Sequence, residues 1–271
     1  MAGGVFVTSG AWADIAGIAL HDEEHSHILL VPLVAGWLFW VRRERLRKYV
    51  PTSTWVGPAV MALGWMLNRV GDYRSIQSFW HLGAILVVVG GFLSVAGGGF
   101  LFRMLPVFAS LCFMVPVPGR VRQAIALPLQ EATAGITQKF LETFGVLAEQ
   151  HGNSIRINNQ DVMIAEACNG LRMVFALVMV SYAFAYGTPL RNWLRVLIVV
   201  ASPATAIFFN VLRLIPTVWA YGNASAEVAT SIHDAGGWVM LPCAFLSLLG
   251  LMRLLRWAQI PITPYILSYG S

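Results

Sequence analysis

Long apolar segments, separated by short polar or basic stretches, fill most of this chain. A helix rises about 1.5 Å per residue and the hydrocarbon layer of a membrane is about 30 Å thick, so an apolar run of roughly 17 residues predicts a spanning helix. Clear candidates lie at 79–96, 100–117, 171–186, 196–221 and 238–255. Shorter or interrupted candidates lie at 5–20, 28–41 and 55–67. The pattern predicts an all-α polytopic membrane protein with seven or eight transmembrane helices.

Two segments between the spans follow other patterns. Residues 123–150 mix apolar and charged positions around Pro128, which predicts an amphipathic helix at the membrane interface or a pair of short helices. Residues 154–164 alternate apolar and polar side chains around Asn158 and Asn159, which predicts a small extracytoplasmic β-hairpin. That hairpin would deliver the chain directly to Cys168.

The composition also indicates a membrane protein. The chain of 271 residues is 57% hydrophobic and 11% charged, whereas a soluble domain carries about a quarter charged residues. We therefore expect a single membrane domain over residues 1–271 and no large soluble module. The net charge of +5 comes from basic residues that cluster in short loops, so it indicates membrane orientation and not nucleic-acid binding. Three scattered cysteines predict no disulfide framework.

The basic loops also predict the depth of three polar residues. The strongest loop, 42–48, is expected in the cytoplasm, together with loops at Arg191 and Arg253. Counting about 1.5 Å per residue away from the cytoplasmic ends gives roughly 28, 27 and 30 Å along three helices. Those lengths bring Cys168, Arg213 and His233 to one level at the opposite, extracytoplasmic face.

These three residue types suit thiol chemistry. A thiolate is the reactive nucleophile, a histidine can take its proton and later protonate a leaving amine, and an arginine can favour the thiolate or stabilise an oxyanion. Arg172 is a second cation one turn after Cys168, and Glu166 could orient either arginine. Asn210 lies three positions before Arg213 in an otherwise apolar run, where polar residues usually serve function. Each residue also has a plainer interpretation, as a core cysteine, a snorkelling arginine or a loop histidine.

A histidine-rich segment precedes the span at 28–41. His21 and His25 are four apart and, with Glu24, could bind zinc or copper on one helix face. The segment could equally be a solvated loop. His27 is expected at the extracytoplasmic face, where it could border the site and contact a substrate.

Taken in order, these motifs resemble the exosortase/archaeosortase family of integral-membrane cysteine transpeptidases. The resemblance covers roughly residues 21–256 and rests on a nucleophile motif, an Asn-x-x-Arg motif, a downstream histidine, an N-terminal Ser-His signature and two proline-containing turns. In this chain the motifs are Cys168-Asn169-Gly170-Leu171-Arg172, Asn210-Val211-Leu212-Arg213, His233 to Gly237, Ser26 to Pro32, Val115 to Pro118 and Leu127 to Gln130.

The resemblance implies a substrate and a location. Substrates would be secreted proteins with a C-terminal sorting motif (Pro-Glu-Pro in many bacterial systems), a transmembrane helix and a basic tail. Cleavage near that motif would form a thioester on Cys168, in a multi-pass protein of the cytoplasmic (inner) membrane whose site faces outward. Beyond the substrate, we expect membrane lipids as partners and neither a cofactor nor a metal.

A second class of function is a transporter without catalysis. Asn210 and Arg213 could bind an anionic solute in a helix that Pro203 and Pro216 interrupt. No inverted repeat is detectable in the chain, which favours the enzyme.

Overall fold

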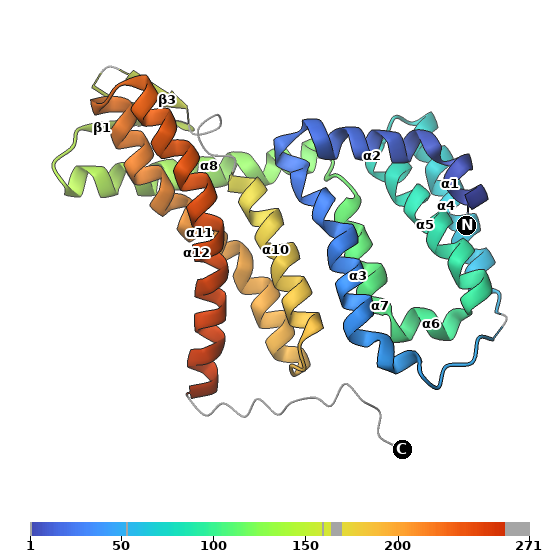
Figure 1. Ribbon diagram of the computed structural model, residues 1–271. Helices are drawn as coiled ribbons and strands as arrows, with labels where there is room; N and C mark the ends of the chain where they lie inside the picture. Colours follow the sequence, from blue (N-terminus) through green and yellow to red (C-terminus); the bar gives the residue numbers. More distant parts are fainter. Residues whose placement is uncertain (1, 53, 159, 164–169, 258–271) are drawn as a thin grey trace. The chain divides into compact units, whose positions relative to one another are not determined.

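The computed structural model describes residues 2–52, 54–158, 160–163 and 170–257, which are mostly helical (Figure 1). The described residues form two compact units, one from 2–119 and 182–192 and the other from 120–163, 170–181 and 193–257. The expectation of one membrane domain stays a prediction.

The first unit is a set of helices of unequal length. Its elements are α1 (Ala2–Val7), α2 (Ser9–His21), η1 (Glu23–Leu30), α3 (Val31–Arg42), η2 (Arg43–Leu46), α4 (Val56–Tyr73), α5 (Gln77–Ala96), α6 (Gly98–Arg103), α7 (Leu105–Ser110) and η3 (Leu111–Met114).

Helices α4 and α5 pack with almost no space between their backbones. A Cβ atom added at Gly83 of α5 would lie 2.3 Å from the backbone nitrogen of Asn68 in α4, and one at Gly71 would lie 2.2 Å from that of Trp80. Small residues are what allow membrane helices to approach so closely. Across this contact the buried Asn68 side chain donates a 2.8 Å hydrogen bond to the Trp80 carbonyl.

The span count of seven or eight is not confirmed. Among the described residues, three helices are long and apolar enough to cross a membrane, namely α5, α11 (Asn192–Asn223) and α12 (Ala226–Trp257). A fourth span results if α2 and the bent segment that follows it, His25–Leu46, are counted together as one. Helix α3 is too short to cross a membrane by itself, because its 12 residues extend only about 18 Å and the hydrocarbon layer is about 30 Å thick. The expected continuous helix over 100–117 is instead broken into α6, α7 and η3. Pro106, in the first turn of α7, cannot donate the hydrogen bond that would continue α6.

One arginine of the predicted cytoplasmic loop is buried within this unit. Arg42, at the end of α3, is 3% exposed and donates a 2.8 Å hydrogen bond to the Tyr186 carbonyl in the last turn of α10 (Gly170–Gly187). A cation there complements the negative end of that helix.

The second unit begins with one helix where two were possible. Helix α8 (Gly119–Thr143) runs through Pro128 and ends seven residues before the predicted limit at Gln150. Gly145, with φ of +79°, ends it. The Gly145 amide bonds the Glu142 carbonyl and the Val146 amide bonds the Leu141 carbonyl, which is the Schellman arrangement.

The predicted hairpin is present and has a third strand. Strands β1 (Ala148–His151), β2 (Ser154–Ile157) and β3 (Gln160–Met163) form an antiparallel sheet in that order. Asn158, with φ of +48°, lies in the β2–β3 turn, as the asparagine pair predicted.

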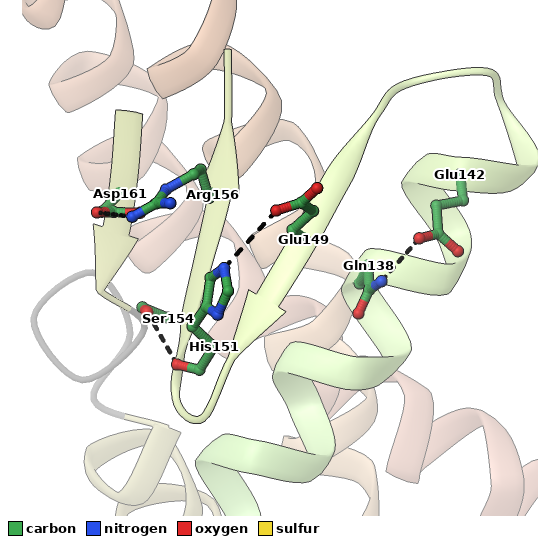
Figure 2. A network of polar contacts seen from close by, with 7 residues as sticks. All are labelled: Gln138, Glu142, Glu149, His151, Ser154, Arg156 and Asp161. Carbon is green, nitrogen blue, oxygen red and sulfur yellow. Dashed lines mark hydrogen bonds and ion pairs between the residues drawn. The ribbon is translucent and has the colours of Figure 1, made fainter. Parts of the chain in front are cut away.

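The two faces of the sheet differ. Arg156 forms two hydrogen bonds, of 2.7 and 2.9 Å, with the Asp161 carboxylate on the exposed face (Figure 2). The Arg156 hydrogen bond lowers the pKa of the Asp161 carboxyl. The other face is buried in a cluster with helices α8 and α11, formed by Ala134, Leu141, Ala148, Ile155, Ile157, Val162, Leu214 and Val218.

Three helices belong mainly to the second unit: α10 (Gly170–Gly187), whose residues 182–187 fall in the first unit, α11 (Asn192–Asn223) and α12 (Ala226–Trp257). Figure 1 shows α11 and α12 side by side in orange and red. A second cluster joins all three helices through Met173, Leu177, Ala206, Ala244 and Leu248. Helices α11 and α12 each have 32 residues, about 48 Å, so each is longer than a hydrocarbon layer is thick.

Candidate active site

Two of the predicted site residues meet between α11 and α12. Nη2 of Arg213 lies 3.4 Å from both ring nitrogens of His233, and both side chains are half-buried. A guanidinium can only donate hydrogen bonds, so a ring nitrogen that accepts from it carries a lone pair. The pair therefore combines a permanent cation with a nitrogen that is able to take up a proton.

The backbone around Arg213 is continuous but lacks one donor. Pro216, within α11, has no N–H, and the Thr217 hydroxyl donates a 2.8 Å hydrogen bond to the Arg213 carbonyl. Arg213 thus projects from a helix whose local hydrogen bonding is supplemented by a side chain.

Asn210 lies one turn before Arg213 on the same side of α11. It is 4% exposed, and its Oδ1 atom has no hydrogen-bond partner among the described residues. A buried carbonyl oxygen without a partner costs about 1–3 kcal/mol. Such an atom is a ready acceptor for an N–H group of a bound molecule.

The remaining predicted site residues are distributed as follows. Arg172 is exposed in the first turn of α10. Cys168 and Glu166 lie outside the described residues. His27 is 7% exposed in η1 and belongs to the first compact unit, so the expectation that it borders the pair stays a prediction.

The histidine-rich segment makes internal contacts. His25 Nδ1 lies 2.9 Å from the Asp22 carboxylate, and His21 Nδ1 lies 3.0 Å from the Gly17 carbonyl oxygen. Among the residues that the structure describes, no three His, Cys, Asp or Glu side chains are grouped as a metal site requires. The side chain of Glu24, the third expected ligand, lies outside the part of the chain that the structure describes, so zinc or copper binding by this segment stays a hypothesis.

One neighbour of Arg213 belongs to the motif from His233 to Gly237, but the sequence assigned it no role of its own. Gly236 of α12 lies against the Arg213 stem, where an added Cβ would be 2.9 Å from Cγ. Its position three residues after His233 places it on the same helix face as that histidine.

The fold and this pair define the protein as a helical membrane protein with a polar site between two long helices. A family model described as transmembrane exosortase matches residues 12–250, nearly the whole chain. The chain belongs to the transmembrane exosortase family, as the motifs predicted, and the family is associated with processing of C-terminal sorting signals on secreted proteins. Comparisons with curated proteins and with solved structures found no match.

Proposed function

We propose that this protein is a thiol-dependent peptidase and transpeptidase that cleaves C-terminal sorting signals, with Cys168 as the nucleophile. His233 is the base and acid, and Arg213 is the electrostatic stabiliser. The observation that carries the proposal is the 3.4 Å contact between Arg213 and His233, because it joins a proton acceptor to a fixed cation.

The residues on either side of Cys168 support its assignment to this pair. Val162, six positions before the thiol, is buried in the cluster that contains Leu214, the residue after Arg213. Met173, five positions after the thiol, is buried in the cluster that joins α10, α11 and α12. Six residues extend at most about 20 Å. Both flanks of the nucleophile are therefore anchored on the helix that carries Arg213.

The proposed chemistry has two stages. The His233 imidazole takes the thiol proton and the sulfur attacks the peptide carbonyl carbon, giving an oxyanion that the Arg213 guanidinium stabilises. The tetrahedral intermediate then collapses, the C–N bond breaks, and the imidazolium returns its proton to the leaving amine. Attack on the thioester by water or by an amine releases the product and restores the thiol.

Other residues have supporting roles in this proposal. Asn210 accepts an N–H of the substrate backbone, which would satisfy its buried oxygen. Arg172, at the start of α10, supplies a second positive charge, and Glu166 orients one of the arginines. His27 contacts the sorting motif. The substrate's own transmembrane helix docks among the enzyme's helices, so that its motif emerges at the level of the site.

Cys168→Ala and Cys168→Ser test the nucleophile against a co-expressed substrate that ends in a Pro-Glu-Pro motif, an apolar helix and a basic tail. Both should abolish removal of the tail while the enzyme remains in the membrane. Cys243→Ala, which removes a half-buried thiol in α12, is the matched control and should leave processing unchanged. Processing that survives both Cys168 variants would reject the assignment.

The proposed orientation is tested by labelling. In a Cys112→Ala, Cys243→Ala background Cys168 is the one remaining thiol. A membrane-impermeant maleimide should label it in intact spheroplasts, because the site faces outward. Labelling that requires permeabilisation would overturn this orientation.

The transporter remains the second candidate, because Arg213 and the buried Asn210 lie in a helix that contains Pro203 and Pro216. Proteoliposomes separate the two functions. Flux of an anionic solute that survives Cys168→Ala, without tail cleavage by the wild-type protein, would favour transport.

A further inference from the structure

The side chain of Arg213 crosses to α12 over a glycine. A Cβ atom at Gly236 would lie 2.9 Å from Cγ, 3.4 Å from Cδ and 4.0 Å from Nε of Arg213. At the neighbouring Gly237 the nearest atom is Nη1 of the same arginine, at 3.9 Å. The stem thus lies against Gly236, and the guanidinium lies beyond it, near Gly237 and His233.

Backbone geometry does not explain the glycine at position 236. It lies in the interior of the 32-residue helix α12, and its φ angle is not positive. A glycine in a helix interior costs about 1 kcal/mol relative to alanine. What glycine provides here is space, because Cγ is near the root of the Arg213 side chain and cannot move aside without carrying the guanidinium with it.

We propose that Gly236 is a positioning residue, whose bare Cα lets the Arg213 stem lie against α12 so that the guanidinium reaches His233. The inference rests on the proposed function and adds the element that aligns its two polar groups. When a group that acts on a reacting centre is displaced by about 1 Å, the rate of the catalysed reaction falls on the order of 100-fold. Gly236 acts only through Arg213, so its effect requires the arginine.

The test compares Gly236→Ala with Gly237→Ala, a matched pair that adds the same methyl group at adjacent positions of one helix. Gly236→Ala should lower kcat for tail cleavage about 10–100-fold with little change in KM. Gly237→Ala should remain within about twofold, because 3.9 Å is ordinary van der Waals contact. Equal effects of the two variants would overturn the proposal.

A double variant separates positioning from a general structural effect. Arg213→Ala removes the stem, so Arg213→Ala with Gly236→Ala should show the same residual cleavage as Arg213→Ala alone. A further loss in the double variant would mean that Gly236 acts independently of the arginine. If Gly236→Ala alone does not fold, the double variant should fold, since the obstructing atoms are gone, and failure to recover folded protein would also overturn the proposal.

A pH profile gives an independent measurement. In the Cys112→Ala, Cys243→Ala background, the iodoacetamide alkylation rate of Cys168 should shift to higher pH in Gly236→Ala, as it should in Arg213→Ala, because the cation no longer favours the thiolate. If the profile shifts in Arg213→Ala but not in Gly236→Ala, the positioning role of Gly236 is rejected, while the proposed role of Arg213 stands. Unchanged cleavage in Arg213→Ala would reject the proposed function itself.

Discussion

The fully buried imidazole of His81 in α5 contacts the Asp14 carboxylate of α2 at 2.9 Å. Gln77 donates a 3.0 Å hydrogen bond to the same carboxylate oxygen. Asp14 is the residue that interrupts the first apolar segment, so the polar position that weakens the hydropathy pattern is also the one that joins two helices of the first unit.

Asp14→Ala should destabilise the first unit by about 1–3 kcal/mol, because it leaves a buried imidazole nitrogen without its partner. The measurement is the thermal unfolding midpoint of the detergent-solubilised protein. Gln77→Ala is the control, since it removes a bond to the same carboxylate from an exposed side chain and should cost much less. Equal losses in the two variants would contradict this account of His81.

Gly83→Ala should destabilise the α4–α5 pair by about 1–3 kcal/mol. Its Cβ would lie 2.3 Å from the Asn68 backbone nitrogen, so the two helices must separate. Gly91→Ala, on the same helix with nothing within 4 Å of the added atom, should be neutral or slightly stabilising. Thermal unfolding and the yield of monodisperse protein measure both, and a neutral Gly83→Ala would show that the backbones are not in contact.

The Arg156–Asp161 pair should make the sheet sensitive to acid. Its hydrogen bond lowers the pKa of the Asp161 carboxyl in the folded state, so its stabilising contribution is complete above the unfolded-chain pKa of about 4. That contribution is lost as the pH falls through the lower folded value. The protection factors of the β2 and β3 amides, which compare the observed exchange rate with the intrinsic rate at the same pH, should fall over that range. Asp161→Asn should remove this part of the pH dependence, and an unaltered profile in Asp161→Asn would contradict it.

The sequence predicted elements well where one local rule dominates. Alternation and the asparagine pair predicted β2 and β3, because a two-residue turn and a period of two are local signals. Strand β1 was missed because residues 144–151 show no alternation, although Gly145 carried a usable helix-stop signal. The break in 100–117 was missed because hydropathy records how apolar a segment is and does not register Pro106.

The candidate site shows the same division between local and tertiary information. Helical rise predicted a common depth for Arg213 and His233, and the structure has the two side chains in contact. Depth alone does not give the direction in which each side chain points around its helix, so the contact itself was not predictable. The proposed role of Gly236 could not be predicted from the sequence either, because it depends on which side chain packs into the space that the glycine leaves.

Asn210→Leu should separate stability from activity. The buried Oδ1 of Asn210 has no hydrogen-bond partner among the described residues, so an apolar side chain of similar volume removes an unsatisfied polar atom and should raise the thermal unfolding midpoint. If Asn210 accepts an N–H of the substrate, the same change should lower cleavage by about 10-fold or more, because the substrate N–H is then left unpaired in a buried site. Stability and cleavage are measured on one preparation. A variant that is more stable and fully active would show that Asn210 has no part in binding, and a less stable one would show that its oxygen is satisfied in the protein.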